Sequence, residues 1–308
     1  MEIISDWKAI PEALRHCACA LGTFDGLHRG HQTVIRTAVD YAQAHGLPSV
    51  VFTFANHPRS VLSPEKAPLV IESEAVRRLQ LEQMGVDALF EPVFTTELAA
   101  MDPLTFLEFL QEKLAPVFVT AGPNYSFGKF GAGRSEMLSE QGDNFGFTAQ
   151  ICPTVDEEGQ MISSTRIREF IVRGELSKAN TWLGHPVSVY GEVMHGDKRG
   201  RLLGFPTANI ALPKQMAVLP KGVYATRVTV EGEIYAGAAN IGNNPTFGIM
   251  ETRLEVHLLH FTGDLYGKNI LVEFLARLRG EEKFPSVDAL IAQMEKDKAE
   301  AERIFLLE

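Results

Sequence analysis

The sequence has little cysteine and no long apolar run. Its three cysteines, Cys17, Cys19 and Cys152, are odd in number, and no C-x-x-C pair occurs. This usage argues against a disulfide framework and against a zinc site, and the cysteines are expected to fill the core. No apolar run approaches the ~18 residues of a membrane-spanning helix, and the first residues carry no charged-then-apolar signal segment. We therefore expect a cytoplasmic protein with no membrane partner.

Positive charge is also scarce. The chain has 308 residues, with 29 Lys and Arg against 39 Asp and Glu, so its formal charge is −10. General nucleic-acid binding usually needs a broad basic surface, so we expect no nucleic-acid partner and only local basic clusters. The G-x-x-x-x-G-K-[ST] loop is absent, which removes support for P-loop chemistry. The length predicts two domains, and we expect a monomer or a weak homo-oligomer.

The first half alternates between short apolar segments and amphipathic segments. Such alternation predicts βαβ units and a parallel sheet covered by helices, a Rossmann-like α/β domain over residues 1–184. The expected strands are Cys17–Leu21, Ser49–Phe54, Ala88–Pro92, Val117–Ala121 and Gln150–Pro153. The expected helices are Gln32–His45, Glu72–Met84, Pro103–Leu114 and Thr165–Leu183. Ligands of such sheets bind at the carboxyl ends of the strands.

The second half, residues 185–308, has a different pattern, in which strand-like segments follow one another directly. This pattern predicts antiparallel β structure, a small barrel, with a domain boundary near Leu183–Pro186. The expected strands are Val187–Met194, Val223–Val230, Ile234–Ile241, Leu254–Phe261 and Asn269–Arg277. A terminal helix is expected from Val287 to about Phe305, with Ser286 as its N-cap.

The segment that says most about function is Gly-Thr-Phe-Asp-Gly-Leu-His-Arg-Gly-His, residues 22–31, between the first strand and the first helix. Its glycines allow close approach of a ligand, and a helix N-terminus attracts phosphate. His28 and His31 are three residues apart, so both should project from one side of the first turn. The alternative is a strand-to-helix turn with incidental histidines. We predict a phosphate site made by this segment, with Gly22, Phe24, Asp25, Gly30 and the two histidines.

Two further segments are candidates for the same site. Ser164 or Thr165 can cap a helix in which Arg166 and Arg168 follow, and positive charge near a helix N-terminus is unfavourable unless an anion binds there. That pattern indicates a triphosphate, although a capped surface helix with solvated arginines would also produce it. The loop at 122–129 follows the fourth strand and carries an amide, aromatic rings and a cation; alone, it would be an ordinary loop.

Together, these motifs resemble the nucleotidyltransferase superfamily, which carries H-x-G-H and a second Ser/Thr-plus-basic signature. The G-x-F-D-G-x-H-x-G-H and S-S-T-R-I-R forms look like the FMN adenylyltransferase module of bacterial bifunctional riboflavin kinase/FAD synthetases. The resemblance implies transfer of AMP from ATP to FMN. It implies that His28 and His31 contact the ATP phosphates, that Ser164, Thr165 and Arg168 secure the triphosphate, and that Asn124 and Phe127 lie near the flavin or the nucleotide. Tyr125 stands where the family usually has Phe, and Asn56 where it usually has Pro.

A second chemical centre is expected in the β-rich half. Residues 196–209 are rich in glycine and cations, as a phosphate-covering loop needs, and Thr207 and Asn209 should point the same way on an extended segment. A hydroxyl and an amide in that arrangement suit a hard cation, whereas the alternative is a polar turn entering a strand. The expected strand around Glu273 is apolar on both faces, and an unpaired charge in such a strand is costly. This suggests that Glu273 is a base facing a cleft. The alternative is a structural glutamate, partly exposed or paired with Arg277 or Arg279.

This half resembles riboflavin kinase along nearly its whole length. The matching segments are Gly204–Asn209 (G-F-P-T-A-N), Asn240–Gly242, Pro245–Gly248, Glu255–Leu259, Asp264–Gly267 and Val272–Phe284. The resemblance implies a six-stranded antiparallel barrel and transfer of the γ-phosphoryl group of ATP to riboflavin. Gly204, Thr207 and Asn209 would bind Mg²⁺–ATP, with Mg²⁺ on Thr207 and Asn209, and Glu273 would be the base. His260 departs from the Asp that the family usually has.

The predicted activity is therefore bifunctional: riboflavin is phosphorylated to FMN, and FMN is adenylylated to FAD, with ATP as co-substrate of both steps. An alcohol nucleophile needs a base, whereas a phosphate nucleophile with a second pKa of about 6 does not. One alternative retains the kinase but adenylylates another phosphate, such as phosphopantetheine. Another is a flavin-binding regulator that has lost turnover.

Overall fold

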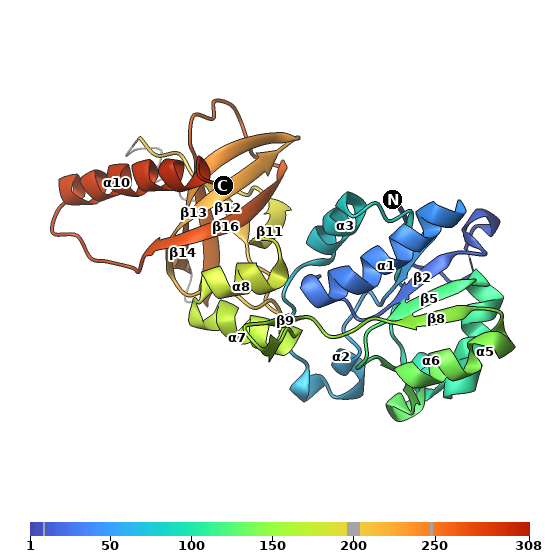
Figure 1. Ribbon diagram of the computed structural model, residues 1–308. Helices are drawn as coiled ribbons and strands as arrows, with labels where there is room; N and C mark the ends of the chain where they lie inside the picture. Colours follow the sequence, from blue (N-terminus) through green and yellow to red (C-terminus); the bar gives the residue numbers. More distant parts are fainter. Residues whose placement is uncertain (9, 196–203, 247–248) are drawn as a thin grey trace. The chain divides into compact units, whose positions relative to one another are not determined.

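The structure is a computed structural model that describes residues 1–8, 10–195, 204–246 and 249–308. Its tertiary contacts separate two compact units, one of residues 1–70 with 77–164, and one of residues 71–76 with 165–308. Figure 1 shows the first as an α/β unit and the second as a β-rich unit. Helix α8 (Leu176–Leu183) counts with the second because Asn180 donates to the carbonyl of Phe274 and accepts from the amide of Val187, both at 2.9 Å. The functional boundary at 184/185 stays a prediction.

The first unit is built on a six-stranded sheet in which every neighbouring pair is parallel. In spatial order its strands are β1 (Glu2–Ile4), β4 (Ala88–Phe90), β3 (Ser49–Phe52), β2 (Ala18–Leu21), β5 (Phe118–Ala121) and β8 (Thr148–Ile151). Five of them confirm the predicted strands, with β8 starting two residues earlier; β1, a three-residue edge strand, was not predicted. The order reverses between β2 and β5, so the loops after these two strands meet at a topological switch point, where such sheets bind ligands.

Helices cover both faces of this sheet (Figure 1). Ala18 and Ala20 of β2 pack with buried residues of α1 (Arg29–His45), such as Ile35. The alternate residues Cys17, Cys19 and Leu21 belong to a second buried cluster with α5 (Pro103–Leu114) and α6 (Ser135–Gln141). Burial of each such Leu or Ile side chain stabilises the folded state by about 1.5–3 kcal/mol, compared with leaving the side chain exposed to water. All three cysteines are buried free thiols, as predicted.

The helix boundaries follow from the residues at their ends. Helix α1 ends at Gly46 in the left-handed conformation (φ 67°), as predicted. Asp102 caps α5 by accepting a hydrogen bond from the amide of Thr105 at 3.0 Å. The other helices of this unit are α2 (Arg59–Leu62), α3 (Glu74–Gln83) and α4 (Thr96–Ala100), with the first residues of α3 counted in the second unit.

The second unit is a six-stranded barrel in which every neighbouring pair is antiparallel. In spatial order its strands are β11 (Val187–Glu192), β16 (Asn269–Arg279), β13 (Gly222–Val230), β14 (Glu233–Thr246), β15 (Ile249–Leu258) and β12 (Ala208–Ala211). An isolated bridge pairs Met194, just after β11, with Asn209 of β12. The predicted barrel is confirmed. Glu231 and Gly232 both have positive φ (50° and 89°), which forms the tight turn between β13 and β14.

Helices of the second unit differ from the prediction in one respect. The helical segment expected over Thr165–Leu183 is two helices, α7 (Ser164–Arg173) and α8, because Gly174 is left-handed (φ 77°) and ends the first. The terminal helix α10 (Val287–Phe305) is as predicted, and Ser286 caps it by accepting from the amide of Ala289 at 3.2 Å. Among the helices in the described part of the chain, none is long and apolar enough to span a membrane.

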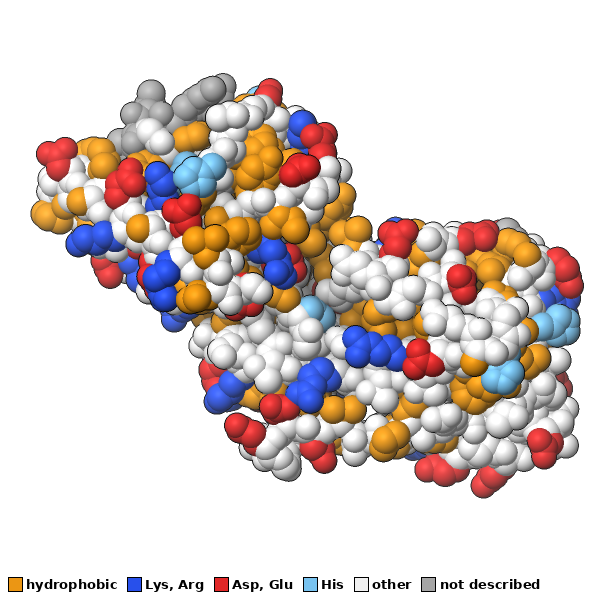
Figure 2. Space-filling view, turned by 45° about the horizontal axis from the view of Figure 1, so that its top comes forward, with side chains coloured by type: hydrophobic (Ala, Val, Ile, Leu, Met, Phe, Trp, Pro, Cys, Tyr) orange, Lys and Arg blue, Asp and Glu red, His pale blue; other side chains and the backbone are white. Residues whose placement is uncertain are grey.

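Charged side chains of both signs are interspersed on the face of the molecule drawn in Figure 2. Lysines and arginines there alternate with aspartates and glutamates, and no broad basic surface is visible among the described residues of that face. Positive charge is therefore local on this face, in keeping with the net charge of −10.

Candidate active sites

The paired histidines of the 22–31 segment meet at the start of α1. Their rings stack with centroids 3.6 Å apart and planes at 18°, so they do project from one side, as predicted. His28 is the N-cap, and its Nδ1 accepts a hydrogen bond from the amide of His31 at 3.3 Å. An Nδ1 that accepts carries no proton, so the proton of His28 is on Nε2, which becomes a donor suited to an anion.

The first turn of α1 lacks the acidic residues that usually compensate a helix N-terminus. It contains Arg29 and His31 instead, and Arg29 is paired with Glu157. The positive end of the helix therefore adds to the effect of the histidine donors. This electrostatic arrangement suits a phosphate ligand.

The predicted residues Gly22, Phe24 and Gly30 shape this turn. Phe24 is buried in the core, and its ring meets that of His31 edge-on, with centroids 5.4 Å apart. Gly22 leaves room for the Phe24 ring, since a Cβ at that position would lie 2.6 Å from it. A Cβ at Gly30 would lie 3.2 Å from the His28 ring. These residues thus set the positions of the two imidazoles.

Asp25 and Ser164 connect this turn to a segment far along the chain. The hydroxyl of Ser164 donates to the carbonyl of Asp25 at 3.0 Å, and Asp25 itself is buried. Thr165, Arg166 and Arg168 follow in the first turns of α7, which also lacks an early acidic residue. Because contacts from Thr165 onward count with the second unit, the proximity of these three residues to the histidines stays a prediction.

The loop after β5 contains the predicted flavin residues Asn124 and Phe127. Asn124 is exposed, and its amide nitrogen is 3.9 Å from the sulfur of Met161. Phe127 is a buried core residue, with its ring 5.2 Å from that of Phe106. Tyr125 packs beside it, and burial raises the pKa of the Tyr125 phenol well above its ordinary value, with Cys19 adding to the effect. Contact of Phe127 with a flavin stays a prediction.

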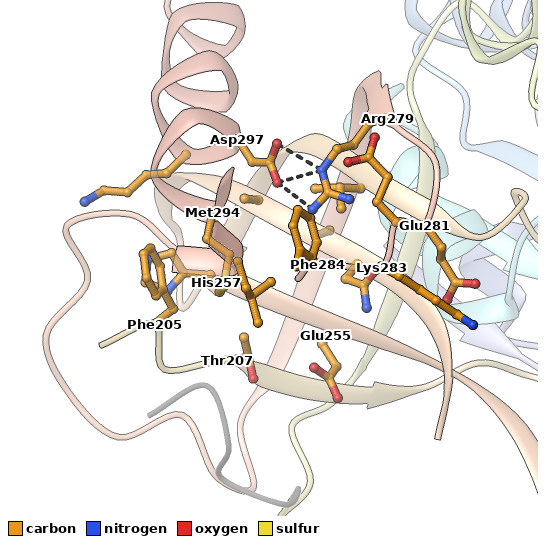
Figure 3. A pocket seen from close by; sticks show the side chains of 17 residues that line it. Phe205, Thr207, Glu255, His257, Arg279, Glu281, Lys283, Phe284, Met294 and Asp297 are labelled. Atoms are coloured by element: carbon orange, nitrogen blue, oxygen red, sulfur yellow. Dashed lines mark hydrogen bonds and ion pairs between the residues drawn. The ribbon is translucent and has the colours of Figure 1, made fainter. Parts of the chain in front are cut away.

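In the second unit, a cavity of about 700 Å³ lies between the barrel and α10 (Figure 3). Its apolar lining includes Phe205, Val223, Phe284, Leu290 and Met294, and its polar lining includes Thr207, Asn240, Glu255, His257 and Arg279. At one end, Arg279 pairs with Asp297 of α10, with an Nη2–Oδ2 distance of 2.8 Å. Figure 3 places Thr207 and Glu255 at the other end. The cavity can hold a flat aromatic ligand with a polar tail.

A second cavity, of about 360 Å³, adjoins Thr207. It is lined by Thr207, Asn209, Phe261, Asp264 and Tyr266, among others. Asn209 is buried, and Gly204, just before this segment, has a φ of 86° that favours glycine. Thr207 thus lines both cavities, and Asn209 lines the smaller one. The predicted Thr207–Asn209 pair therefore lies where the two cavities adjoin.

The strand register adds a residue to which the sequence analysis gave no role. Glu255 of β15 is the partner of Asn209 on one neighbouring strand and of Asn240 on the other. Paired residues present side chains on the same face of a sheet, so these three form a polar row. The available signal was the alternation in Leu254-Glu255-Val256-His257, where Leu254 and Val256 are fully buried and the other two line the large cavity.

Glu273, the predicted base, is elsewhere on the barrel. It belongs to β16, and β13 and β14 separate that strand from β15 in the sheet. Its carboxylate accepts from Arg227 Nε at 2.7 Å and from Nη2 at 3.0 Å. The structure brings Glu255, and not Glu273, to the cavity that Thr207 lines. Glu273 is in an ion pair, as the alternative expected, but its partner is Arg227 and neither Arg277 nor Arg279, and its role as a base stays a prediction.

The remaining expectations concern metal and loop positions. Within the described ranges, no three or more His, Cys, Asp or Glu side chains gather as a metal cluster. Thr207, Asn209 and Glu255 supply hydroxyl, amide and carboxylate oxygens, the donor types that suit Mg²⁺. The predicted phosphate-covering loop, 196–203, and the matching residues Phe247 and Gly248 lie outside the described residues.

His260, the departure from the family pattern, lies in a turn beside the terminal helix. It is left-handed, with a φ of 59°, a conformation that Asn, Asp and His tolerate better than most residues. Its Nε2 is 2.7 Å from a carboxylate oxygen of Glu302 on α10. The residue thus fits a strained turn and links that turn to the terminal helix.

The α/β unit and the barrel unit correspond to the two domains of a bifunctional transferase. Comparison with known families agrees: residues 10–166 match the family model described as FAD synthetase, and residues 183–305 match that of riboflavin kinase. The chain belongs to the family of bifunctional riboflavin kinase/FMN adenylyltransferases.

Individual relatives cover nearly the whole chain. The bifunctional riboflavin kinase/FMN adenylyltransferase of Bacillus subtilis is 38% identical over 96% of this chain and 95% of its own. That of Haemophilus influenzae is 37% identical over 99% of both chains. A solved structure described as a macrolide-efflux protein from Streptococcus pneumoniae has a TM-score of 0.84 and 35% identity, covering 96% of this chain and 97% of its own.

Proposed function

We propose that this chain makes FMN and then FAD. In the barrel unit, riboflavin and ATP react to give FMN and ADP with release of a proton. In the α/β unit, FMN and a second ATP give FAD and pyrophosphate. The observation that carries the kinase assignment is the position of Thr207, which lines both the 700 Å³ and the 360 Å³ cavities. Two substrates that exchange a phosphoryl group must meet at such a shared wall.

Riboflavin fits the larger cavity by size and chemistry. Its ring system would lie among Phe205, Phe284 and Met294, and its ribityl chain would extend toward the end where Thr207 and Glu255 lie (Figure 3). ATP would occupy the smaller cavity, where Asn209 and Tyr266 are found. The terminal hydroxyl and the γ-phosphoryl group then meet beside Thr207.

Glu255 is the base that this arrangement favours. A ribityl hydroxyl is hardly ionised at neutral pH, so a carboxylate within hydrogen-bond reach assists by accepting its proton. Glu255 lines the cavity and is the strand partner of Asn209, whereas Glu273 is committed to Arg227. We accordingly move the predicted base role from Glu273 to Glu255.

Thr207 and Asn209 would hold Mg²⁺ with ATP. Their hydroxyl and amide oxygens are hard donors two residues apart on an extended segment, and Asn209 is buried at the smaller cavity. When bound, the ion would neutralise charge on the phosphoryl group. The protein residues themselves orient ATP and accept the proton of the alcohol.

Adenylyl transfer in the α/β unit needs no base, since the FMN phosphate is already largely ionised at neutral pH. The stacked His28 and His31 at the N-terminus of α1 support electrostatic stabilisation of the triphosphate. Thr165, Arg166 and Arg168 would add hydrogen bonds and charge. Asn124 would contact the flavin or the nucleotide from the loop after β5.

The test uses purified full-length protein with Mg²⁺, ATP and either riboflavin or FMN, and separates the flavins chromatographically. Riboflavin should give FMN and then FAD, with ADP and pyrophosphate as co-products. FMN supplied directly should give FAD and pyrophosphate. Failure of FMN to yield FAD overturns the adenylyltransferase assignment, and failure of riboflavin to yield FMN overturns the kinase assignment.

A further inference from the structure

Three side chains donate hydrogen bonds to alternate carbonyl oxygens of the phosphate turn. The hydroxyl of Thr53 donates to Thr23 at 3.0 Å, that of Ser164 to Asp25 at 3.0 Å, and the amide of Gln32 to Leu27 at 2.9 Å. The donors come from the residue just after β3, from the start of α7 and from the first turn of α1. Every second carbonyl from residue 23 to residue 27 is thus held by a side chain.

The backbone of this turn is strained. Phe24, Gly26 and Leu27 all have positive φ, at 45°, 83° and 32°. A non-glycine residue in this region costs about 1–3 kcal/mol and persists only where its surroundings hold it. Left-handed residues in a turn can also direct successive amide N–H groups to one side, which creates an anion-binding concavity. Since a carbonyl points away from the neighbouring amide of its peptide, fixing the carbonyls fixes the amides as well.

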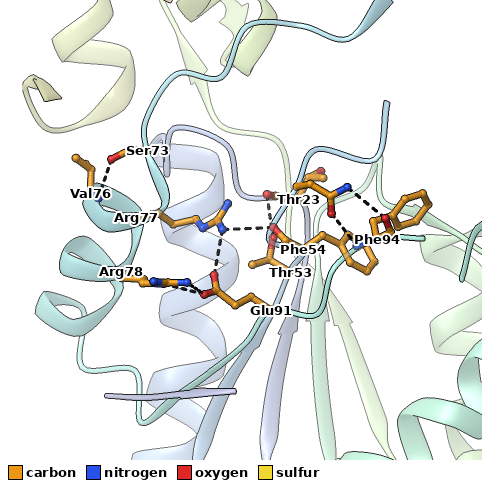
Figure 4. Close-up of polar contacts among 10 residues, drawn as sticks. Thr23, Thr53, Phe54, Ser73, Val76, Arg77, Arg78, Glu91 and Phe94 are labelled. Atoms are coloured by element: carbon orange, nitrogen blue, oxygen red, sulfur yellow. Dashed lines mark hydrogen bonds and ion pairs between the residues drawn. The ribbon is translucent and has the colours of Figure 1, made fainter. Parts of the chain in front are cut away.

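Thr53 is itself held in place by a network at the carboxyl ends of β3 and β4 (Figure 4). Its side chain is buried, and its amide donates to the carbonyl of Phe90 at 3.0 Å. The next carbonyl, that of Phe54, accepts from Arg77, which also pairs with the buried Glu91. The hydroxyl that reaches Thr23 is therefore part of a rigid wall.

We propose that Thr53 and Gln32 are positioning residues for adenylyl transfer. By holding the carbonyls of Thr23 and Leu27, they turn these partial negative charges away from the triphosphate and direct the amides of the turn toward it. Ser164 does the same at Asp25. This inference rests on the proposed function of the α/β unit, and it gives Ser164 a role through the backbone in place of direct phosphate contact.

The test compares Thr53→Val, which keeps the shape and removes the donor, with Thr53→Ser, which keeps the donor. On α1, Gln32→Leu is compared with Gln43→Leu, since Gln43 is an exposed glutamine near the other end of the same helix. The readouts are KM for ATP and for FMN in the forward reaction, and KM for inorganic pyrophosphate in the reverse reaction from FAD. Kinase activity and thermal unfolding of each full-length variant report on folding.

Thr53→Val and Gln32→Leu should each raise KM for ATP and for pyrophosphate by about tenfold, because an unheld carbonyl then faces the phosphates. KM for FMN, kinase rate and Tm should change little, and Thr53→Ser and Gln43→Leu should resemble the wild type. Unchanged KM for ATP and pyrophosphate in both donor-removing variants overturns the inference. An increase in KM that is equal for ATP and FMN also overturns the inference, and so does an increase accompanied by a lower Tm, because either result shows a general structural role. Absence of FAD formation by the wild type would overturn the proposed function instead.

Discussion

Arg227 and Glu273 lie opposite each other on β13 and β16, joined by two hydrogen bonds of 2.7 and 3.0 Å between guanidinium and carboxylate. The hydrogen bond to Glu273 is the main cause of a raised pKa of the Arg227 guanidinium. A carboxylate engaged at both oxygens is poorly placed to accept a proton from a substrate. Glu255, three strands away in the sheet order, is on the wall of the large cavity.

Exchange of each glutamate for glutamine should separate these two roles. Glu255→Gln removes the carboxylate beside Thr207 and should lower kinase kcat by about 10²–10⁴-fold, the usual contribution of a general base. Glu273→Gln should leave kinase kcat within about threefold of the wild-type value. It should lower the free energy of unfolding by about 1 kcal/mol, as expected for loss of a partly exposed ion pair. Initial rates of FMN formation and urea unfolding measure both quantities.

The same pair of variants contains its own control. Both should form FAD from supplied FMN at the wild-type rate, because each change is in the barrel. If Glu273→Gln loses kinase turnover while Glu255→Gln retains it, the base role returns to Glu273.

Glu273 and Glu255 show which part of the candidate kinase site the sequence alone does not decide. Apolar periodicity and capping residues predicted most strands and helices of both units, because those signals are local. Glu273 and Glu255 both lie on β-strands between apolar neighbours, and only the pairing of β12 with β15 puts one of them beside Asn209. Strand register across a barrel is set by contacts far apart in sequence, and a single chain does not display them.

The paired histidines were predictable because their spacing is local, three residues on one helix. The hydrogen bonds that fix the preceding turn were not, since Thr53 and Ser164 are 30 and 139 residues from their acceptors. Phe24, predicted as part of the phosphate site, has its ring in the core beside His31, and its contact with a phosphate stays a prediction. The position of its ring depends on Gly22, where a Cβ would collide with it.

Gly22→Ala should impair adenylyl transfer while the kinase continues. The new Cβ would lie 2.6 Å from the Phe24 ring, which must shift and thereby displace the neighbouring His31 ring. A misplacement of about 1 Å near reacting groups can cost about 100-fold in rate. The control is Gly280→Ala in the barrel unit, where a new Cβ would come no nearer than 3.7 Å to a neighbouring side chain, that of Arg277. Equal FAD synthesis by the two variants would contradict this role of Gly22.

Glu91→Gln should destabilise the α/β unit strongly. Its side chain is fully buried between Arg77, 3.1 Å away, and Arg78, to which it also binds (Figure 4). Breaking one side of a buried ion pair typically costs about 3–5 kcal/mol because the partner charge is left uncompensated. Glu112→Gln is the control, since the side chain of Glu112 is exposed and contacts only a neighbouring lysine among the described ion pairs. Urea titrations should show a large decrease in the free energy of unfolding for Glu91→Gln and a small one for Glu112→Gln. Similar decreases for the two variants would refute the prediction.

Tyr125→Phe should weaken the dependence of stability on alkaline pH. Burial, with a smaller effect of Cys19, raises the pKa of the Tyr125 phenol, so the folded protein retains this proton at pH values where the unfolded chain loses it. The stabilisation is complete below the ordinary phenol pKa of about 10 and decreases above it, by about 1.4 kcal/mol per pH unit. The thiol of Cys19, whose pKa is raised chiefly by its hydrogen bond with Cys17, contributes a similar decline in stability that both proteins share.

The measurement is a series of urea titrations between pH 8 and pH 11. The difference in unfolding free energy between wild type and Tyr125→Phe should stay constant up to about pH 10 and then shift in favour of the variant. A difference that stays constant across the whole range would show that Tyr125 ionises alike in the folded and unfolded chains.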